Sequence, residues 1–225
     1  GLAFQVRIAP SLEEKIREAR EQQAEAAAGR PADPFAEPEP DLYLGPLSDT
    51  HFGLLNKFPV LPDHLLVVTR AYEDQQVPLN AGDFADLAAC LAESDGLGFY
   101  NAGPTAGASQ PHKHLQLVPP LQPDSPFPAP IEALLLPANL GPAPATLEAL
   151  PFPHAACALP PGAGAGELLA RYEALRRAVG LTAPEAPYNL LLTRRWMLLV
   201  PRSREGFEGI MVNALGFAGG FLVRH

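Results

Sequence analysis

Few cysteines and few charged residues are the first features of this 225-residue sequence. Its two cysteines, Cys90 and Cys157, lie far apart, so the chain has neither a CxxC metal or redox pair nor a disulfide framework. Charged residues make up 18% of the chain and the formal net charge is −9. The Lys and Arg stripes with which nucleic-acid binders neutralise phosphates are therefore missing. Small anionic ligands such as nucleotides are not excluded, because they need only a few local cations.

The sequence also lacks targeting and membrane signals. No apolar run reaches the length of a membrane span, and no secretory or lipidation motif is visible. We therefore expect a cytoplasmic protein with reduced thiols, no membrane partner and no nucleic-acid partner. The sequence carries no indication of an oligomeric state.

Proline, in contrast, is abundant, with 27 residues gathered where loops are expected. We interpret the proline clusters in residues 30–41 and 119–130 as surface excursions rather than domain boundaries. At this length and with 47% hydrophobic residues, the chain can bury one sizeable core. We predict a single domain over residues 1–225.

Hydrophobic periodicity predicts the order of the main elements. A capping box at residues 11–14 indicates a helix running towards Ala28, and helical spacing predicts further helices over 80–94 and 167–179. Apolar and β-branched segments predict strands near 43–47, 52–58, 65–69, 97–101, 112–118, 188–193, 196–200 and 219–224. Consecutive strands with few intervening helices favour an α+β fold with an antiparallel sheet flanked by helices.

A loop rich in Gly, Ala and Ser runs directly into a segment with alternating residue types, and this junction carries the chemistry. In a strand, successive side chains point to opposite faces, so His112, His114 and Gln116 would share one face. Leu115 and Leu117 would then point into a core. The loop can turn backbone N–H groups inward to hold phosphate oxygens. A phosphate loop followed at once by an imidazole on a strand predicts nucleophilic attack on phosphorus.

Two plainer interpretations suit the same pattern. One is a polar strand face beside a surface loop, and the other is a metal site that uses the His-x-His pair. A bare His-x-His would leave these readings about even with phosphate chemistry. The Gln two residues further on and the adjacent loop favour phosphate chemistry.

The octapeptide Ser-Gln-Pro-His-Lys-His-Leu-Gln at residues 109–116 resembles the signature of the ATP adenylyltransferases, also called diadenosine tetraphosphate phosphorylases, in the histidine-triad superfamily. Further blocks that resemble this family, in the family's order, lie at 55–60, 64–70, 188–193, 196–202 and 213–219. The resemblance implies a HIT-like fold. It also implies a nucleotidyltransferase that phosphorolyses diadenosine tetraphosphate to ATP and ADP through an adenylyl-histidine intermediate.

The resemblance places the nucleophile at the second histidine, His114, which must be neutral to attack; an ordinary histidine pKa of about 6.5 allows this. His112 would then be a supporting residue. Two such roles are open: a contact with the substrate, and a structural role as a hydrogen-bonded histidine. Gln116 stands where triad hydrolases carry a third histidine, and a neutral amide can only hydrogen-bond phosphate oxygens. Because ATP and ADP leave as stable anions, this favours a transferase over a hydrolase. The Ser109 hydroxyl is placed to stabilise charge on the α-phosphoryl oxygens.

Substrate contacts are implied at further positions. The nucleotide-binding positions carried over by the resemblance are Lys57, Asn101, Gly107, Ala108, Ser109, Gln110, Gln116, Asn213, Ala214 and Leu215. Gly220 and Arg224 stand where the fungal pattern has Met and Lys. Arg keeps the positive charge, whereas Gly lacks a side chain that could pack on a base.

Other aromatic and histidine residues received plainer interpretations. Trp196 and Phe217 could stack on adenine, although such residues are more often part of the core. The remaining histidines have no partner spacing, and we interpret them as structural or surface residues: His51, His64, His154 and His225.

The expected ligands are a dinucleoside polyphosphate, ATP, ADP and phosphate, with a divalent cation such as Mg2+ accompanying the polyphosphate. No protein metal cluster is apparent in the sequence. Two alternatives remain: a relative of the nucleotide-sugar uridylyltransferases, which share a His-x-His-x-Gln logic, and a non-catalytic adenine-nucleotide-binding or sensing protein. The Asn-Lys-Phe and Asn-Ala-Leu-Gly-Phe blocks speak against the first.

Overall fold

The structure is a computed structural model that describes residues 4–8, 17, 33–59, 61–122, 125 and 129–223. The helix predicted after the capping box at 11–14 lies almost wholly outside these residues. Arg224 and His225 lie outside them as well.

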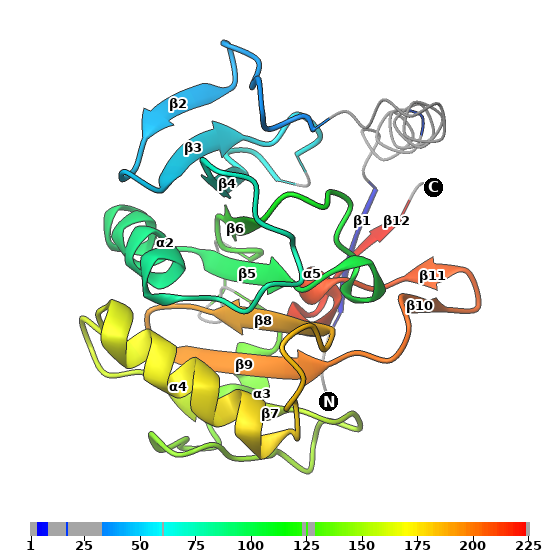
Figure 1. Cartoon of the computed structure of the whole chain (residues 1–225). Coiled ribbons are helices and arrows are strands. Elements are labelled where there is room, and N and C mark those ends of the chain that lie inside the picture. The colour runs from blue at the N-terminus through cyan, green and yellow to red at the C-terminus, as the bar shows by residue number, and fades with distance from the viewer. Residues whose placement is uncertain are drawn as a thin grey trace.

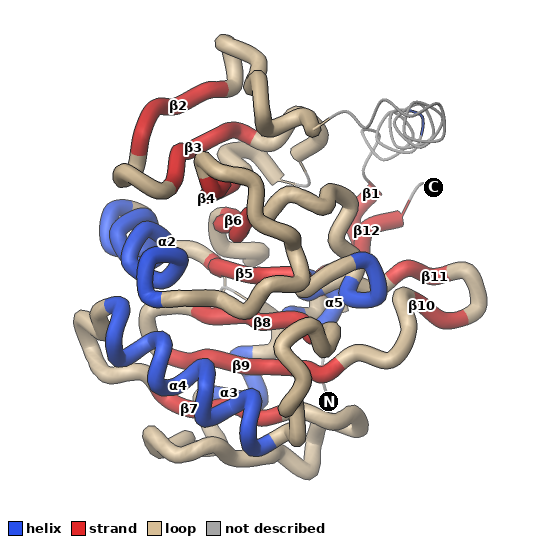
Figure 2. The backbone as a smooth tube through the Cα atoms, viewed as in Figure 1, coloured by secondary structure: helices blue, strands red, loops and turns tan. Residues whose placement is uncertain are grey.

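An eight-stranded sheet forms the centre of the described chain, with the strand order β2-β3-β4-β6-β5-β8-β9-β7 and antiparallel neighbours throughout (Figures 1 and 2). Its strands are β2 (Tyr43–Pro46), β3 (His51–Leu55), β4 (Leu65–Thr69), β5 (Leu97–Asn101), β6 (His114–Val118), β7 (Ala155–Ala158), β8 (Tyr188–Leu192) and β9 (Trp196–Pro201). The predicted α+β fold with an antiparallel sheet flanked by helices is confirmed.

Two longer helices, α2 (Ala81–Glu93) and α4 (Ala165–Ala178), cover one face of this sheet (Figure 1). Helix α2 begins where expected because the side chain of Asn80 accepts hydrogen bonds from the first-turn N–H groups of Gly82 and Asp83. The core under the helices contains Phe84, Leu87, Leu91, Leu168, Tyr172, Leu175, Leu115, Leu117, Leu190, Leu192, Met197 and Leu199. Leu115 and Leu117 therefore point into a core, as predicted.

The opposite face carries a second core beneath α3 (Glu132–Leu135) and α5 (Ala214–Ala218). Trp196 belongs to this core, and its Nε1–H donates to the Glu132 carboxylate at 2.7 Å. Phe217 packs against the same core, with its ring centroid 5.1 Å from that of Phe152. Trp196 is therefore not available to stack on adenine, because its ring is packed in this core and its N–H is bonded to Glu132.

Short elements complete the fold. The strand β1 (Gln5–Ile8) pairs in parallel with β12 (Gly220–Val223), which confirms the predicted C-terminal strand. The hairpin of β10 (Gly206–Phe207) and β11 (Ile210–Met211) and the 3-10 turn η1 (Pro104–Ala106) were not predicted. No helix in the described part of the chain is long and apolar enough to cross a membrane.

Candidate active site

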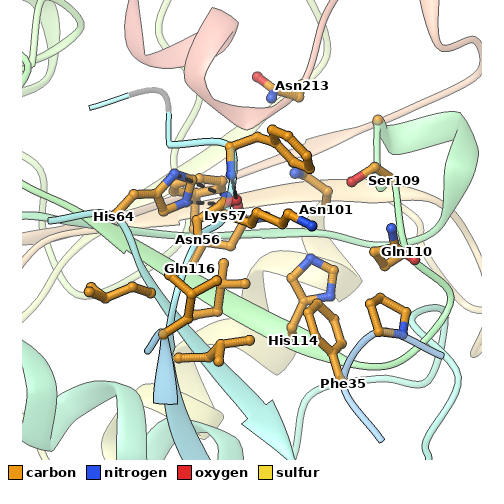
Figure 3. Close-up of a pocket in the computed structure, with 18 of the residues that line it drawn as sticks. Phe35, Asn56, Lys57, His64, Asn101, Ser109, Gln110, His114, Gln116 and Asn213 are labelled. Atoms are coloured by element: carbon orange, nitrogen blue, oxygen red, sulfur yellow. Dashed lines mark hydrogen bonds between the residues drawn. The ribbon is translucent and has the colours of Figure 1, made fainter. Parts of the chain in front are cut away.

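A pocket opens on the face of β4, β5 and β6 that lies opposite α2 and α4 (Figure 3). Its polar lining residues are Glu39, Asn56, Lys57, His64, Asn101, Ser109, Gln110, His114, Gln116 and Asn213. The remaining lining residues are Pro34, Phe35, Leu42, Leu54, Leu55, Phe58, Leu66, Phe99, Gly107 and Leu215. A pocket with both polar and apolar walls suits a ligand that combines a flat base with charged groups.

Strand alternation delivers His114 and Gln116 into this pocket, as the period of two in β6 predicts. The Nδ1 atom of His114 donates a hydrogen bond of 2.8 Å to the backbone oxygen of His112, which can only accept. A neutral imidazole carries one N–H, so the lone pair of His114 is on Nε2. The Phe35 ring stands edge-on to the imidazole, with centroids 5.2 Å apart. The protein thus sets both the orientation of the His114 ring and the tautomer of its neutral form.

The side chain of Gln75 holds the backbone of His114 in place. Continuing the register of β5 and β6 from the pair Phe99 and Gln116 places Asn101 opposite His114. At this point Gln75 inserts: its Oε1 accepts from the His114 N–H at 2.8 Å, and its Nε2 donates to the carbonyls of Asn101 and His114. Gln75 is only 1% exposed. The buried amide of Gln75 therefore takes the place of the strand hydrogen bonds between Asn101 and His114. No sequence motif indicates this role of Gln75.

The loop after β5 closely approaches the C-terminal segment that contains Val212 and Asn213. Gly107 has φ +88°, and a Cβ atom there would lie 2.9 Å from the Cβ of Asn213. Only glycine suits both conditions, because it adopts positive φ freely and has no side chain. Gly107, Ser109 and Gln110 line the pocket, whereas Ala108 is not among the lining residues.

Asn101 ties this loop to the C-terminal block. Its Oδ1 accepts hydrogen bonds from the backbone N–H of Ala214 at 3.0 Å and from the side chain of Asn189 at 2.7 Å. Arg202 then donates to Asn189 Oδ1 and to the backbone oxygen of Val212, both at 2.6 Å. Ala214 thus takes part through its backbone N–H, which binds Asn101. Arg202, for which no role was predicted, holds the pocket wall beside Asn213 through its bond to Val212.

His112 is placed differently from the prediction that it shares one strand face with His114 and Gln116. It is not among the residues that line the pocket, and it pairs with Asp74 in an isolated bridge, so β6 begins two residues later than predicted. Its Nε2–H donates to the backbone oxygen of Thr69 at 2.8 Å, and its Nδ1 lies 2.7 Å from the Asp33 carboxylate. Of the two roles left open for His112, this geometry favours the structural one.

The other predicted residues divide between the pocket and its surroundings. The Lys57 side chain is 47% exposed, and its ammonium lies 2.9 Å from the Glu39 carboxylate, at the pocket wall. Leu215 and Asn213 line the pocket from the N-terminal end of α5. Gly220 lies in β12, outside the pocket lining, where a Cβ atom would meet Leu121 at 3.3 Å. Gly220 is therefore not part of the wall of this pocket.

Histidine 64 is the main residue that the sequence analysis missed. His64 lines the pocket, and its Nε2 lies 3.0 Å from Oε1 of Gln116. Its place just before β4 gave no spacing signal relative to the motif at 112–116. The structural interpretation does hold for His51, which contacts Asp83, and for His154, whose Nε2 accepts from the Leu147 N–H.

Comparison with protein families gives two matches that together span most of the chain. Residues 1–137 match the Ap4A phosphorylase N-terminal domain, and residues 148–225 match the ATP adenylyltransferase C-terminal domain. Strands of both segments enter the one eight-stranded sheet, where β5 of the first pairs with β8 of the second.

Individual proteins from Saccharomyces cerevisiae show the same similarity. The diadenosine 5',5'''-P1,P4-tetraphosphate phosphorylase 2 is 32% identical over 224 residues, which cover 85% of this chain and 69% of the relative. The protein APA1 is 30% identical over 252 residues, covering 96% and 74%. Among solved structures, yeast Ap4A phosphorylase Apa2 in complex with Ap4A matches with a TM-score of 0.74 at 29% identity, covering 89% of this chain and 75% of that chain.

Proposed function

Because the chain belongs to the Ap4A phosphorylase / ATP adenylyltransferase family, we propose that His114 is the nucleophile with which it cleaves diadenosine tetraphosphate. The chain is a nucleotidyltransferase of this family. Nε2 of His114 attacks the α-phosphorus, the N–P bond forms, and the P–O bond to the remaining polyphosphate breaks. ATP leaves and an adenylyl group remains on His114. Phosphate then attacks the same phosphorus, which releases ADP and regenerates the imidazole.

The observation that carries this proposal is the hydrogen bond from His114 Nδ1 to the His112 carbonyl, in a pocket that also contains Gln116. The bond directs the lone pair to Nε2, as an in-line attack requires. Backbone and side-chain donors of Gly107, Ser109 and Gln110 line the same pocket and suit the phosphoryl oxygens, with Lys57 as a nearby cation. The apolar wall around Leu54 suits the adenine.

Gln116 supports transfer rather than hydrolysis. A neutral amide can orient phosphoryl oxygens but supplies no proton to a poor leaving group and accepts none from water. ATP and ADP leave as stable anions and need little protonation. The same site therefore serves phosphate as an acceptor well and activates water poorly.

We also propose that Mg2+ reaches the site together with the polyphosphate. Within the described residues, no group of three or more His, Cys, Asp or Glu side chains is arranged to hold a metal ion. Glu39 is the one acidic residue in the described pocket lining, and it lies against Lys57. The oxygens that Mg2+ prefers would then be those of the substrate, where the ion offsets negative charge.

The test is a product analysis of diadenosine tetraphosphate incubated with and without phosphate. We expect ADP and ATP in equal amounts when phosphate is present, and at most one ATP per protein molecule when it is absent. AMP plus ATP formed equally fast without phosphate would make the protein a hydrolase. Tight nucleotide binding with no product and no adduct would favour the non-catalytic sensor.

A further inference from the structure

Three side chains from separate segments meet at one side of the pocket. Asn56 follows β3, His64 precedes β4 and Gln116 lies in β6, and all three are labelled in Figure 3. A backbone hydrogen bond from the N–H of Asn56 to the oxygen of His64, at 2.8 Å, brings the first two segments together. The three side chains then form a continuous line of hydrogen bonds.

The direction of every bond in this line follows from one backbone donor. The N–H of Phe58 donates to Oδ1 of Asn56 at 2.9 Å, so the other end of that amide, Nδ2, is a donor. Nδ2 lies 3.3 Å from Nδ1 of His64, which therefore accepts. His64 then carries its proton on Nε2, which donates to Oε1 of Gln116 at 3.0 Å. A backbone N–H thus determines which end of the Gln116 amide faces His64.

We propose that His64 is a positioning residue that directs the NH2 group of Gln116 towards the phosphoryl oxygens of the substrate. This inference rests on the proposed function. With Oε1 bound to His64, the donor end of the amide is the end available to a ligand in the pocket. The opposite orientation has nearly the same shape but would turn a carbonyl oxygen towards anionic oxygens. His64 therefore converts an amide with two similar orientations into a dedicated donor.

Burial strengthens this selection. His64 is 3% and Gln116 8% exposed, and the His64 ring packs against Phe99 with centroids 5.9 Å apart. Replacing His64 by an apolar side chain would remove the hydrogen-bond donor that His64 provides to Oε1 of Gln116. The NH2 group of Gln116 would then face the phosphoryl oxygens only part of the time. Because this group stabilises charge that develops in the transition state, its loss affects kcat more than substrate binding.

The first experiment compares His64→Leu with His64→Gln in steady-state phosphorolysis. We expect His64→Leu to lower kcat by about tenfold, the order of one hydrogen bond to a charged group, while KM changes by less than about twofold. His64→Gln places an amide NH2 near the former Nε2 and should recover most of the loss. His154→Leu is the matched control, because it removes another buried histidine that is not among the residues lining the pocket and should leave kcat unchanged.

A double-mutant cycle with Gln116→Ala separates positioning from a general structural effect. If His64 acts through Gln116, His64→Leu should cause no further loss of kcat in the Gln116→Ala background. The proposal is overturned if His64→Leu costs the same factor in both backgrounds, or if it leaves kcat of the otherwise wild-type protein intact. If His64→Leu does not fold, Asn56→Leu removes the donor that sets the His64 tautomer, and the same coupling to Gln116 is expected. A wild-type protein that performs no phosphorolysis would instead refute the proposed function.

Discussion

The Nδ1 atom of His114 lies 2.8 Å from the backbone oxygen of His112, two residues earlier in the same segment. The partner that orients the proposed nucleophile is thus main chain rather than side chain. The ring of His112 is engaged elsewhere, with Thr69 and Asp33. The two histidines of the motif therefore have separable roles, although only Lys113 separates them in the sequence.

Replacing His114 tests its role as the proposed nucleophile. His114→Ala should abolish the adenylyl adduct and lower turnover by about a thousandfold or more, because the reaction then lacks its intermediate rather than one stabilising contact. Intact-mass measurement after incubation with substrate and no phosphate, at mildly alkaline pH, detects the added AMP on the wild-type protein. Nucleotide binding should survive, since Lys57 and the loop at 107–110 remain.

The matched variant is His112→Ala, which keeps the carbonyl that accepts from His114. It should still form some adduct, at a reduced rate, because the tautomer is retained while the support from Thr69 is lost. Peptide mapping that places the adduct on His112 would preserve the reaction class and contradict the choice of nucleophile.

Exchanging the amide of Gln116 for an imidazole tests the preference for transfer. Gln116→His provides a group that can assist water, so the share of AMP among the products should rise several-fold relative to ADP. Gln116→Ala is the control, because it removes the amide without adding a base. The measurement is the AMP to ADP ratio at a fixed phosphate concentration, and an unchanged ratio in Gln116→His would count against this reading of Gln116.

Much of the sheet follows from local patterns. The segments 65–69 and 97–101 are short apolar runs with clear ends, and β4 and β5 match them residue for residue. The period of two in β6 correctly separates His114 from Leu115. β7 was missed because Ala155–Ala158 is a short run of small residues whose strand state depends on pairing with β9.

The site was less accessible to sequence reasoning wherever contacts join distant segments. Gln75 and His64 act through side-chain hydrogen bonds to residues 39 and 52 positions away, and no spacing within one element indicates such partners. His112 shows a different limit of local patterns. Alternation predicts which face His112 occupies, but this residue pairs with Asp74 in an isolated bridge and lies outside β6. Local periodicity therefore predicts faces, whereas tertiary pairing decides which residues reach the pocket.

The amide of Gln75 offers a test of how strongly backbone position matters. Gln75→Leu leaves the buried His114 N–H without an acceptor, which should cost about 2 kcal/mol of unfolding free energy and lower kcat by about tenfold or more. Gln76→Ala, a change at the partly exposed neighbour, is the control and should retain kcat. Denaturant unfolding and phosphorolysis rates measure the two effects, and normal turnover in Gln75→Leu would show that the clamp on His114 is dispensable.

Beneath the site, on the opposite face of the sheet, Lys113 and Asp83 form an ion pair of 2.7 Å in which both side chains are 0% exposed. Asp83 also accepts hydrogen bonds from His51 and from the Asn80 backbone. Burial alone would raise the pKa of the Asp83 carboxyl, but the hydrogen bond from His51 and the charge and hydrogen bond of Lys113 outweigh it and lower the pKa below its usual value of 3.8.

A lowered pKa in the folded state makes the stabilisation by Asp83 dependent on pH. Its contribution is fully present above the unfolded-state pKa, near 3.8, and is lost as pH falls through the lower pKa of the folded state.

Asp83→Asn leaves Lys113 buried without its closest counter-charge and should cost about 3 kcal/mol at pH 7. The difference between variant and wild type should begin to narrow below pH 3.8, because the unfolded-state carboxyl then takes up a proton while the folded-state carboxyl is still ionised. Urea unfolding at pH 7, 5 and 3.5 measures this trend, with Asp95→Asn at an exposed ion pair as the control, expected within about 0.5 kcal/mol of wild type. A difference for Asp83→Asn that stays constant to the lowest pH would show that shape, rather than charge, accounts for its effect.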